Sequence, residues 1–175
     1  MEKALRTASS FLPYHLLAYG TLLGTQLFHS FVNTKICYKA LSMDQFVKLQ
    51  KQIFPIYFAT QVSLTALTAV TRPPFGIFSL AKDPWSAAPL AIAGVASSLN
   101  WYIYGPKTSS ASMKRRLMQV TENPISDPNS HKAHSVNRNF ARNHAMAIHL
   151  NAIAVIATVL YGFSLSATIL DGRHI

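Results

Sequence analysis

Long apolar segments without any charge alternate along the chain with shorter segments that carry all of its charges. Four segments contain no Asp, Glu, Lys or Arg: residues 7–34, 52–71, 84–106 and 143–170. As an α-helix, about 20 apolar residues cross the roughly 30 Å hydrocarbon core of a bilayer. The pattern therefore predicts four membrane-spanning helices, at about residues 11–33, 54–71, 85–105 and 145–169.

A soluble helical bundle is the competing interpretation of this pattern. Helices of a soluble bundle carry a polar face that recurs at a period near 3.6 residues, and none of the four segments contains a charge. Only 13% of the 175 residues are charged, against about 25% in an ordinary soluble domain. We therefore predict an all-α fold, an integral membrane bundle of four transmembrane helices with short amphipathic cytosolic helices.

The predicted spans form one membrane domain, residues 11–170, between short tails at 1–10 and 171–175. The loops at 34–53 and 106–143 fall on one side and carry eleven of the 16 Lys and Arg residues. Because cytoplasmic loops are enriched in Lys and Arg, these loops are expected in the cytosol and both termini on the other side. We expect an intracellular membrane, the endoplasmic reticulum or the mitochondrial outer membrane, rather than the plasma membrane.

Local signals mark the ends of the predicted helices. Ser42 and Gln45 have the spacing of a capping box, which predicts a short amphipathic helix on the cytosolic surface. Pro55 is expected to kink the chain where it enters the membrane. Pro106 is expected to end or bend the third span, because proline lacks the backbone donor and clashes with the preceding turn.

Gly20 and Gly24 form a Gly-x-x-x-Gly motif in the first span. Small residues at this spacing let two helix backbones approach closely. We expect the motif to pack against a neighbouring helix of the same chain rather than to dimerise the protein.

Uncharged polar side chains within the spans form the candidate site. Gln26 and Asn33 are seven residues apart on one face of the first span, and His144 and Asn151 have the same spacing at the fourth. Polar groups that face lipid cost free energy, so they are expected to face each other inside the bundle. They serve either as interhelical hydrogen bonds, worth about 0.6 kcal/mol per pair, or as a cytosol-facing polar pocket. The candidate set also takes in Tyr57 of the second span and Arg142, which is charged and lies just before the fourth span. Its members are Gln26, Asn33, Tyr57, Asn100, Arg142, His144 and Asn151.

A basic cluster follows the third span at Lys114, Arg115 and Arg116. Such a cluster sets topology, and it also suits contact with lipid headgroups. The partners expected from these features are the lipid bilayer, including anionic lipids, and a membrane protein or a second copy of the chain.

Catalytic and metal-binding motifs are scarce. Gly162–Ser166 lacks the final glycine of a nucleophile elbow, and no carboxylate lies in any predicted span. His131 and His134 lie in a turn-rich segment with only Asp127 nearby, and Cys37 is the single cysteine. We expect no enzymatic activity, no cofactor, no metal and no nucleic-acid partner.

Several pieces of the sequence resemble the transmembrane protein 205 family, which is also catalogued as a domain of unknown function. Order and spacing agree over about residues 16–165. The resemblance implies a small four-span membrane protein and supplies no reaction. The matching pieces are Gly24-x-Gln26, Phe31-Val32, Phe46–Gln50, Phe54-Pro55-x-Tyr57-Phe58, Asn100, Pro106-x-Thr108, Asn139-Phe140-x-Arg142-x-His144 and Asn151.

Two hypotheses for function remain open at this point. The first is a multi-pass membrane protein without enzymatic activity that acts as a structural, interaction or organising protein with a cytosol-facing polar cluster. The second is a carrier of a small solute or cation. The small size of the chain and the lack of paired broken helices speak against a carrier.

Overall fold

The computed structural model describes residues 9–121 and 131–171, and these residues form helices and turns without any strand. This confirms the all-α prediction. Two of the helical segments, η1 and η2, are π-helical turns, which are wider than α-helical ones and are often found at functional sites. The elements are α2 (Leu12–Leu27), η1 (Phe28–Asn33), α3 (Thr34–Ala40), α4 (Met43–Val70), α5 (Ile77–Ala81), α6 (Pro84–Leu99), η2 (Asn100–Tyr104), α7 (Gly105–Thr121) and α8 (His131–Leu170).

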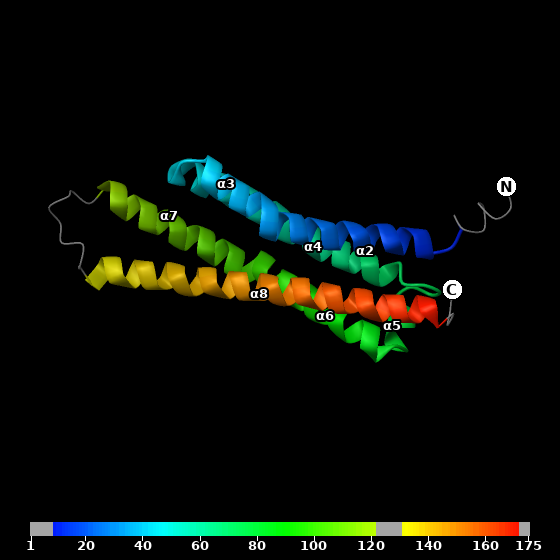
Figure 1. Ribbon diagram of the computed structural model, residues 1–175. Helices are drawn as coiled ribbons and strands as arrows, with labels where there is room; N and C mark the ends of the chain where they lie inside the picture. The colour runs from blue at the N-terminus through cyan, green and yellow to red at the C-terminus, as the bar shows by residue number, and fades with distance from the viewer. Residues whose placement is uncertain (1–8, 122–130, 172–175) are drawn as a thin grey trace.

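Four long rods lie side by side: α2 with η1 and α3, then α4, then α6 with η2 and α7, and finally α8 (Figure 1). Rods that follow each other along the chain run in opposite directions, so α4 and α8 run the same way. The start of α2, α5 and the end of α8 lie at one end of the bundle, here called the α5 end. α3, the last turns of α7 and the start of α8 lie at the other, the α7 end.

The first two rods extend beyond the predicted spans at the α7 end. α2 continues through η1 into α3, and α4 begins at Met43, so most of the predicted loop at 34–53 is helical. Ser42 caps α4 by accepting from the Gln45 N–H, while the Gln45 side chain accepts from the Ser42 N–H. The capping box is confirmed. The surface helix expected there is not a separate element, because α4 runs unbroken through Pro55.

Pro106 does not end the third rod, so the expectation that the helix would end there is corrected. α7 begins at Gly105 and follows η2 without a break, so Pro106 lies where the wide turn passes into the α-helix. The wide turn η2 precedes it and bonds the Gly105 N–H to the Asn100 carbonyl. The helix then continues to Thr121.

Gly105 is required by this close approach of backbone to backbone. A Cβ atom there would lie 2.6 Å from the Asn100 carbonyl oxygen and 3.5 Å from the Phe58 ring. Gly105→Ala is therefore expected to lower the free energy of unfolding by about 1–3 kcal/mol, the usual effect of overpacking, as measured by unfolding in detergent. Gly20→Ala is the matched control, because its added methyl meets open space, and equal losses in both variants would contradict the packing argument.

The fourth rod also begins earlier than its predicted span. α8 starts at His131, so the last part of the turn-rich segment, with His131 and His134, is helical. Residues 122–130, including Asp127, lie outside the described residues.

The Gly-x-x-x-Gly motif faces outward, which corrects the expected packing within the chain. Gly20 and Gly24 are both exposed on α2, and a Cβ added at either would meet no described atom within 4 Å.

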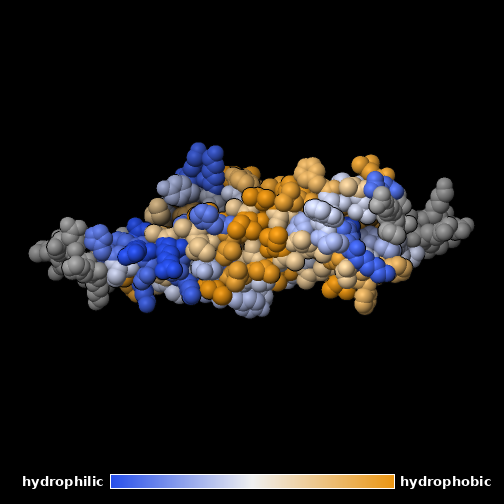
Figure 2. Space-filling model, turned by 90° about the horizontal axis from the view of Figure 1, so that it is seen from below, coloured by the Kyte–Doolittle hydropathy of each residue, from blue (hydrophilic) through white to orange (hydrophobic). Residues whose placement is uncertain are grey.

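The described bundle exposes many large apolar side chains and buries many polar ones. Every rod exposes large apolar side chains, among them Phe28, Ile56, Val95 and Phe163. Of the ten largest fully buried side chains in the described ranges, Leu22 is the only one without a nitrogen or oxygen atom. Figure 2 shows a broad hydrophobic band across the middle of the bundle, with hydrophilic residues gathered mainly at the α7 end. α4 and α8 are each long and apolar enough to cross a bilayer.

Candidate functional site

Five polar side chains from all four rods meet in the middle of the bundle. We call Ser30, Tyr57, Gln61, Ser97 and Asn151 the central cluster. The Asn151 carboxamide oxygen accepts from the Tyr57 hydroxyl at 3.0 Å and from Gln61 Nε2 at 3.1 Å. Its nitrogen donates to the Ser30 hydroxyl at 2.9 Å, and the Ser97 hydroxyl donates to Gln61 Oε1 at 2.9 Å. Asn151 thereby joins α8 to the first two rods, and Gln61 joins α4 to α6.

The central cluster forms because polar residues recur along one face of α4 at helical spacing. The buried members of this stripe are Gln50, Tyr57, Gln61, Thr65 and Thr68. The Thr65 hydroxyl donates to the Gln61 carbonyl at 2.7 Å, and the Thr68 hydroxyl donates to the Leu64 carbonyl at 2.8 Å. The hydroxyls of these threonines are hydrogen-bonded within α4, whereas the side chains of Tyr57 and Gln61 form hydrogen bonds to other rods.

Gln26 and Asn100 lie beside the central cluster and are completely buried, as expected for an inward face. Gln26 is one turn from Ser30, and neither of its amide atoms has a partner among the described residues. Asn100 begins η2 and donates to the Ala147 carbonyl at 3.1 Å, while its Oδ1 is unpaired. Tyr57 and Asn151 of the candidate set are thus joined directly, and Gln26 and Asn100 are their neighbours.

Asn33 lies at the edge of this region. It is half-buried at the end of η1, where its Nδ2 lies 3.2 Å from His29 Nδ1 and its Oδ1 accepts from the Cys37 thiol at 3.5 Å. The His29 ring in turn packs against Tyr57, with ring centroids 4.0 Å apart. Asn33 therefore contacts the central cluster only through His29.

Arg142 and His144 do not join the cluster, which corrects their place in the candidate set. Arg142 is nine residues from Asn151, which is half a turn around a helix with 3.6 residues per turn, and its side chain is exposed. His144 lies two turns nearer the α7 end, where α8 packs against α7, and it stacks on Phe140 with ring centroids 5.3 Å apart.

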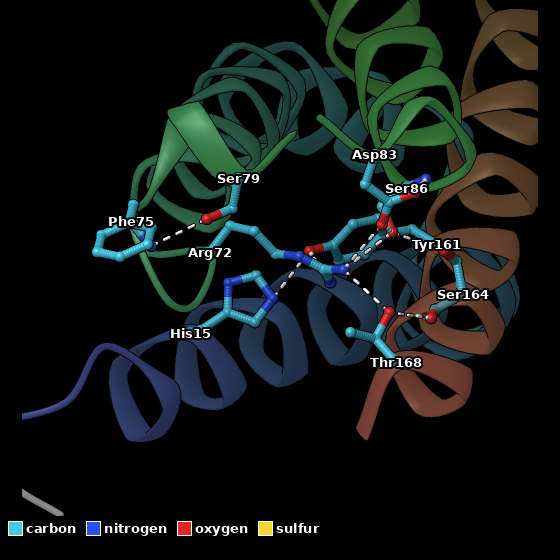
Figure 3. A network of polar contacts seen from close by, with 9 residues as sticks. All are labelled: His15, Arg72, Phe75, Ser79, Asp83, Ser86, Tyr161, Ser164 and Thr168. Atoms are coloured by element: carbon cyan, nitrogen blue, oxygen red, sulfur yellow. Dashed lines mark hydrogen bonds and ion pairs between the residues drawn. The ribbon is translucent and has the colours of Figure 1, made fainter. Parts of the chain in front are cut away.

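A second polar cluster at the α5 end was missed by the sequence analysis. It surrounds Arg72, whose side chain is only 3% exposed although it was assigned to a connecting loop. The members of this Arg72 cluster come from α2, α6, α8 and the α4–α6 connection, and Figure 3 labels all of them except Thr71: His15, Thr71, Arg72, Asp83, Ser86, Tyr161, Ser164 and Thr168.

The Arg72 guanidinium donates to four different side chains. Its Nη2 lies 3.2 Å from Asp83 Oδ2, 3.0 Å from the Ser86 hydroxyl and 3.1 Å from the Thr168 hydroxyl. Its Nη1 donates to the Tyr161 hydroxyl at 3.3 Å. The guanidinium carbon also lies 5.7 Å from the centre of the Tyr161 ring, within the range of a cation–π contact. A buried charge needs such partners to offset its desolvation.

The remaining members close the Arg72 cluster. The Tyr161 hydroxyl is 2.8 Å from His15 Nε2, and His15 Nδ1 is 3.3 Å from the Thr71 hydroxyl. Asp83 caps α6 by accepting from the Ser86 N–H at 3.3 Å. Two opposite charges flanking a short connector, Arg72 and Asp83, were the signal in the sequence that could have indicated this site.

The basic cluster on α7 is partly engaged within the chain. Arg116 forms an ion pair with Asp44 of α4, and the Arg115 guanidinium lies 5.4 Å from the centre of the Phe140 ring. Lys114 is exposed. No group of three or more His, Cys, Asp or Glu side chains suited to a metal ion occurs in the described ranges.

Comparisons with known proteins identify the family. The model of a domain of unknown function, DUF4149, matches residues 17–117, which include most of α2, all of α4 and α6, and most of α7. The chain is also 50% identical, over 98% of its own length and 99% of the relative's, to a protein of Aspergillus fumigatus named xanthocillin biosynthesis cluster protein D. No solved structure matches. The chain therefore belongs to the family defined by this domain of unknown function.

Proposed function

We propose that the protein is an integral membrane protein in which all four rods cross the bilayer. α4 and α8 are long enough by themselves. α2 with η1 supplies 22 consecutive helical residues and α6 with η2 supplies 21, close to the length a bilayer core requires. The resemblance to the transmembrane protein 205 family, which implies four spans, supports the same arrangement.

The distribution of apolar surface supports this arrangement further. A soluble bundle buries its large apolar side chains, yet here Leu17, Ile56, Ile92 and Ile156 are exposed on four different rods. Helices in a membrane gain little by burying apolar groups against each other, and they associate through close packing and interhelical hydrogen bonds instead. The two polar clusters supply such bonds.

The proposed orientation places the α7 end in the cytosol. α3, α7 and the start of α8 carry most of the basic residues, which favours that side. The α5 end then faces the opposite compartment. We propose an intracellular membrane, either the endoplasmic reticulum or the mitochondrial outer membrane. The exposed Lys114 and the neighbouring Arg115 would contact anionic headgroups at the cytosolic surface.

The function best supported by this geometry is that of a membrane-embedded structural or organising protein without enzymatic activity. The observation that carries the proposal is the central cluster, in which Asn151 bonds to Ser30, Tyr57 and Gln61. These polar groups are used to hold the rods together. The name of the Aspergillus fumigatus relative suggests that such a protein serves a biosynthetic gene cluster, and we propose a supporting role of this kind at the membrane.

A carrier for a small solute is the second candidate, favoured by the unpaired amide of Gln26 beside the cluster. Flux into liposomes that contain the purified protein separates the two functions. We expect no flux above that of empty liposomes for a panel of small solutes and cations. Flux that disappears in an Asn151→Leu variant that is still folded would overturn the organising role and establish the carrier.

A further inference from the structure

An open groove lies between α2 and α4 on the outer surface of the bundle, close to the α5 end. Its volume is about 440 Å³. Side chains of residues 9–21, at the start of the first rod, form one side of it, and side chains of residues 64–71, at the end of α4, form the other. The groove lies outside the central cluster and meets the Arg72 cluster only at Thr71.

The groove forms because short side chains on α2 lie opposite the end of α4. The antiparallel register is set by the contact of His15 with the end of α4. In this register, Ala18 and Thr21 lie level with residues 64–68, which include two leucines. Ala18 is 4% exposed and forms part of the floor, whereas Leu67 across from it is 46% exposed. The short side chains on α2 therefore leave space between the two rods unfilled.

The lining of the groove is uncharged and largely apolar. Among the described residues, no Asp, Glu, Lys, Arg, His, Asn or Gln lines it. The Thr71 hydroxyl already donates to the Leu67 carbonyl at 2.6 Å and lies 3.3 Å from His15 Nδ1. Ser9 and Ser10 lie at the outer end, before α2 begins, and apolar side chains form most of the rest. The lining thus suits a hydrocarbon chain whose polar head lies at the α5 end.

The size of the groove indicates which kind of molecule it can hold. From Phe11 to Thr21 the chain rises about 15 Å, which is about half of the roughly 30 Å hydrocarbon core. A molecule that enters from the α5 end therefore spans one leaflet. A helix of this length and about 10 Å across would occupy about 1,200 Å³, nearly three times the volume of the groove. The groove has room for a chain and not for a helix of another protein or of a second copy.

We propose that the groove binds one acyl chain of a phospholipid from the non-cytosolic leaflet, with the headgroup beside Ser9 and Ser10. The inference rests on the proposed four-span arrangement, which turns this side of α2 and α4 toward the hydrocarbon core. The exposed apolar side chains around the groove, among them Leu17 and Leu67, then face lipid as well. The bound chain fills the gap between the two rods and becomes a structural component of the bundle.

Retention of lipid by the purified full chain tests the groove. The protein is reconstituted in bilayers of phosphatidylcholine and cholesterol, extracted in a mild detergent and analysed by native mass spectrometry. Thr21 is exposed and lines the groove, so Thr21→Leu fills the groove without entering the interior of the bundle. Gly20→Leu is the matched control, because it adds a leucine at the next position, where a Cβ meets no described atom within 4 Å.

The unmodified protein and Gly20→Leu are expected to retain one phospholipid per chain, and Thr21→Leu is expected to retain several-fold less. Retention of no lipid by the unmodified protein would overturn the proposal. Equal retention by Thr21→Leu and Gly20→Leu would also overturn it, because the lipid would then lie elsewhere on the surface. Retention of cholesterol in place of phosphatidylcholine would show that the groove holds a sterol and not an acyl chain.

Photolabelling separates failure of the groove from failure of the four-span arrangement, and it needs no variant. The unmodified chain is reconstituted with a phosphatidylcholine that carries a diazirine on one acyl chain. Ile92 and Ile156, which are exposed on α6 and α8, should be labelled in any four-span arrangement, and absence of label there would contradict that arrangement. Label at both positions but none at Leu64, which is half-buried in the groove, would overturn the lipid site alone.

Discussion

Arg72→Met is expected to lower the free energy of unfolding by about 3 kcal/mol, the low end of the range for removing one partner of a buried ion pair. The low end applies because the side chain of Asp83 is 34% exposed and water partly compensates it. Methionine fills a similar volume, so the loss measures the polar contacts to Tyr161, Asp83, Ser86 and Thr168 rather than a cavity. Unfolding of the purified protein in mixed detergent micelles provides the measurement.

Arg116→Met is the matched control, because it removes an arginine from an ion pair that is largely exposed. Arg116 and Asp44 are 32% and 46% exposed at their side chains, and exposed pairs contribute about 0–1 kcal/mol. If the free energy of unfolding fell by the same small amount in both variants, the Arg72 cluster would not hold the rods together. A double-mutant cycle with Asp83→Asn would show how much of the loss in Arg72→Met is due to the ion pair with Asp83.

Asn151→Leu is expected to lower the free energy of unfolding by about 2 kcal/mol. The variant removes hydrogen bonds to Ser30, Tyr57 and Gln61, and interhelical bonds in membrane proteins contribute about 0.6 kcal/mol each, with a maximum near 1.7. Leucine is close in size to asparagine, so packing is largely retained. The same detergent unfolding assay measures the loss.

Tyr57→Phe tests the additivity of the central cluster. It removes one of the bonds to Asn151 and one contact to Ser30, so its loss should be smaller than that of Asn151→Leu. In an Asn151→Leu background the additional loss from Tyr57→Phe should shrink, because the partner of the hydroxyl is already gone. Full additivity of the two losses would show that the two side chains do not act together.

The all-α fold could be predicted because absence of charge is a strong signal over more than 20 residues. The capping box at Ser42 and Gln45 was equally readable, since it depends on two side chains three residues apart. Helix ends were harder to predict. Pro106 was expected to stop a helix, but it lies in the first turn of α7, directly after the π-helical turn η2. No local sequence pattern predicts such a turn.

The candidate site was predicted in part. Asn151 could be found because isolated polar side chains in apolar segments must find partners, whereas Tyr57 was indicated by the family resemblance. Ser97 and Gln61 were overlooked although the polar residues of α4 recur at helical spacing, which is the pattern of a helix that turns its polar face inward. Arg72 lies between two predicted spans. Its burial could not be predicted, because it depends on partners from distant parts of the chain.

In the proposed four-span arrangement, the fixed position of Arg72 limits the thickness of membrane that the protein fits. Between Lys51 and Arg72 lie 20 residues without a charge, all but the last of them in α4, and they rise about 30 Å. Arginines near helix ends usually extend toward the headgroups to relieve hydrophobic mismatch, but this one is held inside the bundle by Tyr161 and Thr168. In the four-span arrangement, a thicker, sterol-rich bilayer would have to thin around α4, at a fraction of a kcal/mol per Å. Bilayer thickness alone would thus sort the protein toward the thinner membranes of the cell.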